Sequence, residues 1–167
     1  MKTLFIGGIK SGKSYHAEQY ALRYSKNLPV YLATTEFIDE EMKERIERHK
    51  LQRSQNFLTK EESMNLLEAI HPIKNLVLVE CISMWINNML YHAFTYEDIE
   101  DHILKVLALP HDIVFVQNDV GSGVIPDNAL ARQYVDISGK ISQILGEHCD
   151  KVFHVIAGIA TQVKGKK

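Results

Sequence analysis

The chain has 167 residues, of which 46% are hydrophobic and 24% charged, and its formal net charge at pH 7 is −2. This length suits one domain with a substantial core, so we expect residues 1–167 to form a single domain. The chain lacks the basic character of a nucleic-acid-binding protein, so we expect no nucleic-acid partner. It also lacks an apolar stretch of transmembrane length, so we expect no insertion into a membrane. The two cysteines, Cys81 and Cys149, fit no metal spacing and indicate a reducing compartment, so we expect a cytoplasmic protein.

The first predicted elements flank a glycine-rich turn. Residues 3–6 form a short apolar run typical of a strand, and apolar residues recur at helical spacing between residues 14 and 24. The segment between them, Gly7-Gly8-Ile9-Lys10-Ser11-Gly12-Lys13-Ser14, matches G-x-x-x-x-G-K-[ST]. This pattern between a strand and a helix is the phosphate-binding loop of nucleotide-handling proteins.

The fixed positions of this loop each have a physical role. Glycine has no Cβ, so the backbone can fold closely around a phosphate and aim its N–H groups at it. Lys13 would place a positive charge on the β- and γ-phosphates, and the Ser14 hydroxyl would hold Mg²⁺ together with phosphate oxygens and water. The sequence therefore predicts a site for a nucleoside triphosphate and Mg²⁺.

The rest of the chain alternates strand-like and helical patterns. Further strands are expected at residues 28–33, 75–80, 112–117 and 151–157. Helices are expected at residues 39–53, 62–70, 83–93, 96–109 and 128–148, with a glycine-rich loop at 118–127. This alternation predicts an α/β fold of the P-loop NTPase (RecA-like) type, with a mostly parallel sheet and helices on both faces.

Ligands of such a sheet bind at the carboxyl ends of its strands. The polar residues that follow the predicted strands are Thr34, Thr35, Glu36, Glu80, Asn118 and Asp119. Glu80 is placed like the acidic residue that supports Mg²⁺ in phosphate-loop enzymes, although a carboxylate there could also cap the next helix. Asp119 also fits ordinary turn chemistry.

The predicted helix at residues 39–53 has only a thin apolar stripe. Arg45, His49 and Arg53 lie four residues apart and therefore share one face. The imidazole could attack a phosphorus atom while the guanidinium groups hold phosphate oxygens and keep the imidazole uncharged. A charged helix face can also be merely solvated, and the residues alone leave both interpretations open.

These motifs occur together in one order along nearly the whole chain. After the phosphate loop come Tyr31-Leu32-Ala33-Thr34, Asp39-Glu40-Glu41-Met42, Arg45-Ile46-x-x-His49, Thr59-x-Glu61, Glu80-Cys81, Asn118-Asp119-Val120-Gly121-x-Gly123-Val124-Ile125-Pro126 and Leu130-Ala131-Arg132. The set resembles the bifunctional adenosylcobinamide kinase and adenosylcobinamide-phosphate guanylyltransferase family of cobalamin nucleotide-loop assembly.

The resemblance implies two reactions at overlapping sites. First, ATP or GTP phosphorylates the aminopropanol hydroxyl of adenosylcobinamide. The family's helical histidine, which His49 matches, then attacks the α-phosphate of GTP, and the guanylylated histidine passes GMP to the corrinoid phosphate, giving adenosylcobinamide-GDP. The resemblance also implies a homotrimer.

The loop and the resemblance together define the expected site. His49 and Lys13 are expected to be catalytic, and Ser14 and Glu80 to bind the metal. The expected nucleotide-binding residues are Gly7, Gly8, Ile9, Lys10, Ser11, Gly12, Lys13, Ser14, Thr34, Thr35, Glu36, Lys50, Arg53, Glu61 and Glu80. Lys10 stands where the family usually has Arg, and lysine cannot make the bidentate phosphate contact of arginine.

Other functions compete with this interpretation. A small-molecule kinase without guanylyl transfer needs the phosphate loop and Glu80 but not His49. A regulatory GTP switch would need an Asn-Lys-x-Asp guanine signature, which the sequence lacks, and its one Asp-x-x-Gly, at residues 136–139, falls inside a predicted helix. A nucleic-acid-dependent ATPase is disfavoured by the charge balance.

Overall fold

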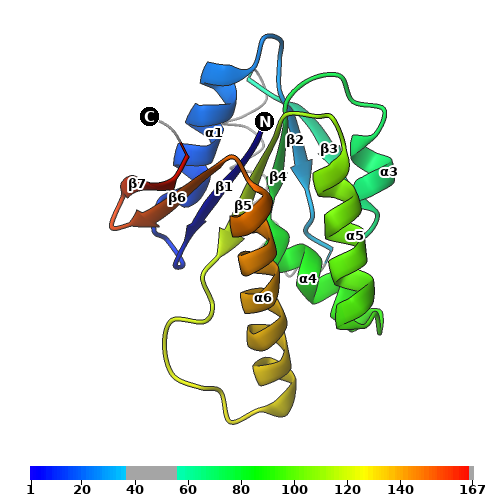
Figure 1. Cartoon of the computed structure of the whole chain (residues 1–167), viewed down its shortest axis with the longest axis vertical. Helices are drawn as coiled ribbons and strands as arrows, with labels where there is room; N and C mark the ends of the chain where they lie inside the picture. The colour runs from blue at the N-terminus through cyan, green and yellow to red at the C-terminus, as the bar shows by residue number, and fades with distance from the viewer. Residues whose placement is uncertain (37–55, 166–167) are drawn as a thin grey trace.

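The computed structural model describes residues 1–36 and 56–165, which form one sheet flanked by helices (Figure 1). The strands are β1 (Lys2–Gly7), β2 (Val30–Ala33), β3 (Leu58–Glu61), β4 (Val77–Glu80), β5 (Ile113–Asn118), β6 (Lys151–Ile156) and β7 (Ile159–Lys164). The helices are α1 (Lys13–Tyr24), α3 (Leu66–Ile70), α4 (Ile82–Tyr91), α5 (Tyr96–Ala108) and α6 (Ala129–His148). The helix predicted at residues 39–53 lies outside the described residues.

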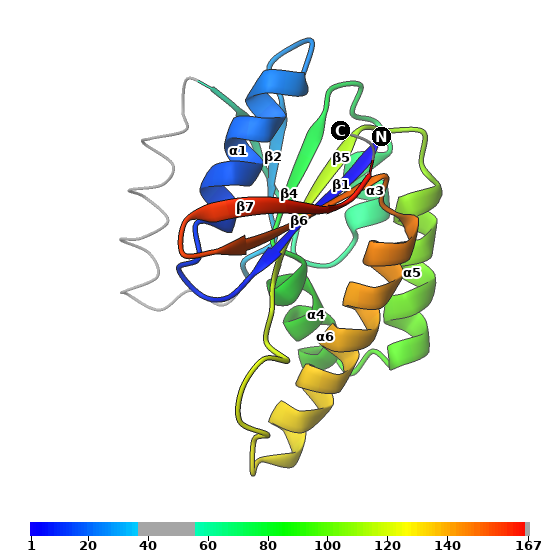
Figure 2. The ribbon, with the colours of Figure 1, turned by 60° about the vertical axis from the view of Figure 1, so that its left-hand side comes forward.

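The seven strands follow the order β3-β2-β4-β5-β1-β6-β7. All neighbouring pairs are parallel except β6 and β7, which form an antiparallel hairpin beside β1 (Figure 2). The predicted mostly parallel sheet is therefore confirmed. The central strands are apolar on both faces because helices cover both sides of a parallel sheet.

Alternate residues of the central strands enter two separate cores. Leu4, Val77 and Phe115 face the side of the sheet covered by α3, α4, α5 and α6. Phe5 and Leu78 face the opposite side, where they pack on α1. The period of two along each strand thus distributes the apolar residues between the two layers of helices. The prediction of helices on both faces of the sheet is confirmed.

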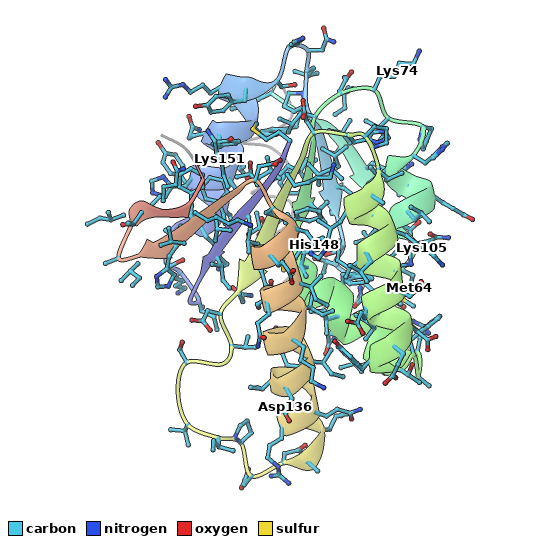
Figure 3. The ribbon with its side chains drawn as sticks, viewed as in Figure 1. Met64, Lys74, Lys105, Asp136, His148 and Lys151 are labelled. Carbon is cyan, nitrogen blue, oxygen red and sulfur yellow. The ribbon has the colours of Figure 1, made fainter. Side chains whose placement is uncertain are left out.

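Two charged side chains illustrate the outer surface of the molecule. Figure 3 shows Lys74 and Lys105 directed away from the sheet, and both are exposed. Lys105 forms an ion pair with Asp101 one turn earlier on α5, at 2.6 Å. Among the described residues, no helix combines the length and the apolar character needed to cross a membrane.

Three local predictions were wrong or incomplete. The helix predicted from residue 62 begins only at Leu66, because the Glu62 carboxylate accepts the N–H groups of Met64 and Asn65 and the Asn65 side chain then caps the helix. Strands β3 and β7 were not predicted. Both are edge strands with mostly exposed side chains, so neither carries the apolar run that identifies a buried strand.

Gly7, the last residue of β1, gives a first test of this packing. A Cβ there would lie 2.3 Å from the backbone oxygen of Val155 on β6, whereas a Cβ on Gly8 would meet no atom within 4 Å. Overpacking typically costs about 1–3 kcal/mol, and we expect Gly7→Ala to cost about 3 kcal/mol because the obstructing atom belongs to the backbone. Urea unfolding without nucleotide measures this, with Gly8→Ala as the matched control. Equal stability of the two variants would contradict the packing.

His102 gives a second test. Its Nε2 accepts the N–H of Leu67 at 3.3 Å, and burial, assisted by Lys105, lowers the pKa of the imidazole despite Asp101 and Glu62. The unfolded chain therefore binds the proton first, so the free energy of unfolding should fall as the pH drops below about 6.5. For one proton the slope cannot exceed about 1.4 kcal/mol per pH unit.

His102→Gln keeps an acceptor for the Leu67 N–H but does not titrate. Its free energy of unfolding should therefore fall less steeply between pH 7 and pH 5 than that of the parent chain. The same substitution at the exposed His71 is the control. An unchanged slope in His102→Gln would show that His102 does not contribute to the pH dependence.

Candidate active site

The phosphate loop joins the end of β1 to the start of α1, as predicted. Gly12 precedes the helix with φ of 95°, and Lys10 has φ of 57°, so the loop twice enters the left-handed region. The first N–H groups of a helix have no acceptor within the helix, and the helix dipole adds partial positive charge at that end. The loop therefore ends in a group of backbone donors suited to an anion.

Backbone carbonyls of the loop are held by hydrogen bonds to the protein. The Gly7 oxygen accepts the N–H of Asp119 at 3.0 Å, and the Gly8 oxygen accepts the N–H of Ser11 at 3.2 Å. Lys13 Nζ also donates to the Gly8 oxygen at 3.1 Å. The Lys13 side chain is only 7% exposed, so its charge is kept close to the loop. The Gly7 and Gly8 carbonyls are therefore paired with donors of the protein.

Ser14 and Glu80 come together across the sheet. Strand β5 lies between β1 and β4, and its register brings Gly7 opposite Asn118 and Glu80 opposite Val116. The Ser14 hydroxyl donates to Glu80 Oε1 at 2.8 Å. The predicted closeness of the two side chains is thus present in the structure.

The oxygen atoms of Ser14 and Glu80 fit a Mg²⁺ ion, which prefers oxygen ligands and keeps several of them as water and substrate phosphate. In residues 1–36 and 56–165, no group of three or more His, Cys, Asp or Glu side chains could hold a metal by itself. This pair therefore suits a metal that arrives with a triphosphate and shares its coordination with it.

The other predicted residues of this edge have varied surroundings. Thr34 is fully buried, and its hydroxyl donates to the Cys81 carbonyl and accepts the Cys81 N–H, both at 2.8 Å. Thr35 follows it, half-buried. Glu36 Oε1 pairs with His92 Nε2 at 2.8 Å, and Glu61 lies at the end of β3, opposite Ala33.

The carboxyl ends of the parallel strands therefore share one edge of the sheet, as predicted. The hydrogen bonds of Thr34 go to Cys81, and Glu36 pairs with His92, so these contacts do not involve the phosphate loop. Ile9 and Lys10 lie in the exposed part of the loop. His49, Lys50 and Arg53 lie outside the described residues.

Sequence reasoning missed Asn88, which stabilises this edge from α4. Its side-chain nitrogen donates to the backbone oxygens of Thr34 at 2.7 Å and Ser63 at 3.0 Å, and the residue is fully buried. The available signal was an amide on the apolar face of the helix predicted at residues 83–93. A buried amide in that setting needs backbone partners, and here they fix the end of β2.

Cys81 follows Glu80 directly, but its thiol is not suited to chemistry. Burial raises the pKa of Cys81 to about 12, and the neighbouring Glu80 carboxylate acts in the same direction. The thiolate is the reactive and metal-binding form of cysteine. Cys81 therefore stays protonated at neutral pH, in agreement with the absence of a metal spacing in the sequence.

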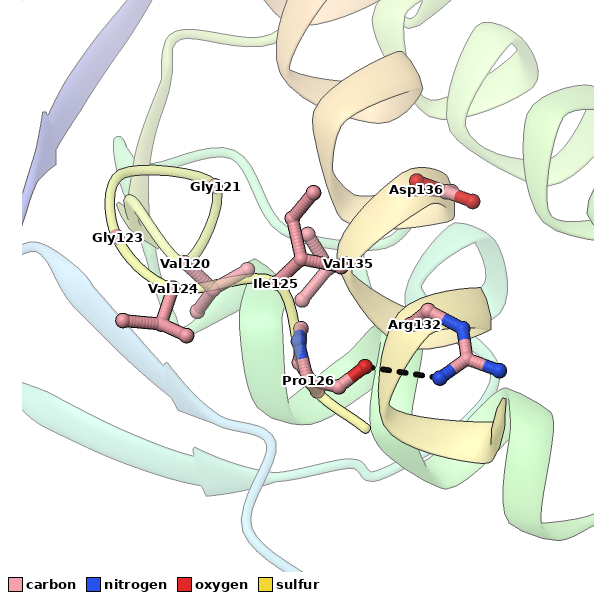
Figure 4. Close-up of a pocket in the computed structure, with 9 residues that line it drawn as sticks. All are labelled: Val120, Gly121, Gly123, Val124, Ile125, Pro126, Arg132, Val135 and Asp136. Carbon is pink, nitrogen blue, oxygen red and sulfur yellow. Dashed lines mark hydrogen bonds between the residues drawn. The ribbon is translucent and has the colours of Figure 1, made fainter. Parts of the chain in front are cut away.

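A separate pocket of about 130 Å³ lies between the glycine-rich loop after β5 and the start of α6 (Figure 4). Arg132 Nη1 donates to the backbone oxygens of Pro126 at 2.9 Å and Asp127 at 2.7 Å, which ties the loop to α6. Within the same loop, the Asp119 carboxylate accepts the N–H of Gly121 and the hydroxyl of Ser122, so the predicted turn chemistry is present. This volume is well below the roughly 300 Å³ at which small-molecule sites begin.

The chain is similar to one protein family over nearly its whole length. A family model described as cobinamide kinase / cobinamide phosphate guanyltransferase matches residues 3–163. The bifunctional adenosylcobalamin biosynthesis protein CobU of Escherichia coli (strain K12) is 33% identical over 183 aligned positions, which cover 98% of this chain and 100% of that protein. The protein of the same name from Salmonella typhimurium is 34% identical with the same coverage.

The bifunctional adenosylcobalamin biosynthesis protein CobP of Pseudomonas aeruginosa is 34% identical over 99% of both chains. Among solved structures, the flagellar accessory protein FlaH from Methanocaldococcus jannaschii superposes with a TM-score of 0.53 at 14% identity, over 99% of this chain and 78% of that one. The similarity to FlaH concerns the P-loop NTPase fold alone. Because the family match spans residues 3–163, and with them every described part of the site, the chain belongs to the cobinamide kinase / cobinamide phosphate guanyltransferase family.

Proposed function

We propose that this chain phosphorylates adenosylcobinamide and then transfers GMP from GTP to the product, giving adenosylcobinamide-GDP, with one phosphate loop serving both reactions. The observation that carries the proposal is the Ser14–Glu80 pair, at 2.8 Å, beside the start of α1. This pair connects a triphosphate-binding loop to an oxygen site for Mg²⁺. Membership of the family indicates which substrates the loop serves.

The described residues perform the binding step. Backbone N–H groups at the start of α1 hold phosphate oxygens, and Lys13 Nζ exchanges the Gly8 carbonyl for phosphate. Ser14 and Glu80 would hold Mg²⁺, which would supply positive charge that offsets the negative charge of the triphosphate. Position and electrostatics thus provide most of the catalysis.

In the kinase reaction, the aminopropanol hydroxyl of adenosylcobinamide attacks the γ-phosphorus of ATP or GTP. A new P–O bond forms, the bond to the β-phosphate oxygen breaks, and the hydroxyl proton is released to solvent. Lys13 stabilises the negative charge that develops on the departing diphosphate.

In the guanylyltransferase reaction, the His49 imidazole attacks the α-phosphorus of GTP. An N–P bond forms, the bond between the α-phosphorus and the bridging oxygen breaks, and pyrophosphate leaves. An oxygen of the corrinoid phosphate then attacks the same phosphorus, so the N–P bond breaks and His49 is regenerated. The family resemblance of the motif that ends at His49 supports this role of the histidine. In the same step, Lys50 and Arg53 would contact phosphate oxygens.

We further propose that the protein works as a homotrimer in the cytoplasm. The trimer is supported by the family resemblance, and a reducing compartment by the two free, buried thiols of Cys81 and Cys149. Sedimentation equilibrium should therefore give three times the mass of one chain, and a monomer would refute the trimer.

The histidine mechanism can be tested with GTP labelled at the α-phosphate. The parent chain should become labelled, with the acid-labile, alkali-stable linkage of a phosphohistidine. His49→Ala should not become labelled, and its rate of guanylyl transfer should fall at least about 10³-fold, as expected for removal of a nucleophile. It should still phosphorylate adenosylcobinamide.

The exposed His71→Ala serves as the control. Label that persists in His49→Ala would refute the histidine mechanism. A parent chain that phosphorylates the corrinoid without becoming labelled would instead be a small-molecule kinase without guanylyl transfer.

The metal role of Glu80 can be tested with Glu80→Gln, which keeps an acceptor for the Ser14 hydroxyl but removes the charge. Both reactions should slow by about 10²-fold, and a higher Mg²⁺ concentration should be needed for half-maximal rate. The matched substitution at the exposed Glu68 should change neither quantity. An unchanged Mg²⁺ dependence in Glu80→Gln would exclude Glu80 from the metal site.

A further inference from the structure

The turn between β6 and β7 contacts the phosphate loop. Ile156 pairs with Ile159, so the hairpin turns in two residues, Ala157 and Gly158. Their φ angles are 50° and 81°, and two successive positive values match the tight turn that suits the twist of a hairpin. The turn lies beside the loop because β6 runs parallel to β1 and pairs with it up to Gly7.

Gly158 uses both of its backbone polar groups on the phosphate loop and α1. Its N–H donates to the Ser11 oxygen at 2.9 Å. Its own oxygen lies 2.7 Å from Nε2 of His16, in the first turn of α1, so that nitrogen carries the proton and donates. The contact is close, since a Cβ built on Gly12 would lie 3.3 Å from the Gly158 Cα.

The first of these bonds determines where the next N–H points. The Ser11 oxygen and the Gly12 N–H belong to one planar trans peptide unit, so they point in opposite directions. Holding the Ser11 oxygen on the hairpin aims the Gly12 N–H to the opposite side, away from the hairpin. The Gly12 N–H thereby joins the donors at the start of α1.

This peptide unit needs an external restraint. Gly12 adopts φ of 95° and has no side chain, so the unit beside it can rotate at low cost. A rotated unit would present the Ser11 oxygen, a negative dipole, to the incoming phosphate and would withdraw one donor. The Gly158 N–H favours the binding-competent orientation, and His16 holds Gly158.

We propose that the β6–β7 turn presets the phosphate loop for the triphosphate and that His16 is the positioning residue that holds the turn there. The inference rests on the proposed function only in taking a nucleoside triphosphate as the ligand of the loop. His16 is called a positioning residue because it acts through Gly158 and Ser11.

Three substitutions separate a positioning role from a merely structural one. His16→Gln can place an N–H donor where Nε2 lies, His16→Asn is too short to reach, and His16→Leu has no donor. The probe is Mg²⁺ with the α,β-methylene analogue of GTP, which cannot release pyrophosphate, and binding is measured by calorimetry on the full chain. The matched control is His148→Leu, because His148 Nδ1 also bonds a backbone oxygen, that of Ile144, at 2.9 Å, but at the far end of α6.

We expect Asn and Leu at position 16 to weaken binding by about tenfold, which corresponds to one hydrogen bond of about 1.4 kcal/mol. His16→Gln should restore most of the affinity, and His148→Leu should bind like the parent chain. Because both proposed reactions use the same loop, the KM for nucleotide should rise by a similar factor in each, with kcat changed much less.

Parent-like affinity in folded His16→Asn or His16→Leu would overturn the proposal. Equal losses in the Gln, Asn and Leu variants would also overturn it, because the N–H donor would then not be the group that matters. Since the binding measurement uses no corrinoid and no guanylyl transfer, a failure of the proposed function leaves it unaffected. A parent chain that binds the analogue but is never labelled by GTP refutes the histidine mechanism alone.

Discussion

The close approach of β1 and β6 at Gly7 is the constraint on which the site depends. A Cβ at this position would lie 2.3 Å from the Val155 oxygen, so only glycine lets the two strands pair to the end of β1. The chain leaves the sheet at this point and must turn at once into α1. The phosphate loop thus lies between the β6–β7 hairpin and Asp119, the residue after β5, whose N–H donates to the Gly7 oxygen.

Distant parts of the chain complete the loop on both sides. On one side, β4 ends at Glu80, whose carboxylate accepts the Ser14 hydroxyl. On the other side, Gly158 binds Ser11 and His16. In the proposed mechanism, the negative charge that binds the metal and the contacts that align the loop for phosphate therefore come from different strands. The sheet register brings them to one edge, since parallel strands end on the same side.

This division suits a protein family that carries out two reactions on phosphates. On the proposed function, the described residues supply what phosphoryl and guanylyl transfer share: backbone donors, the Lys13 charge and an oxygen site for Mg²⁺. The reactions differ in the attacking group, a substrate hydroxyl in one and, as proposed, His49 in the other. On this proposal one loop serves both reactions, and only the nucleophile and the phosphorus atom that it attacks differ.

The sequence by itself determined the parallel sheet with helices on both faces, the phosphate loop, the position of Glu80 and the family, because these depend on local patterns: periodicity, apolar strands and motifs of adjacent residues. Only the tertiary structure decided the edge strands β3 and β7, the buried amide of Asn88 and the bond from His16 to Gly158. Exposed edge strands carry no apolar run, and His16 and Gly158 are 142 positions apart. Such contacts depend on strand order, which local patterns do not specify.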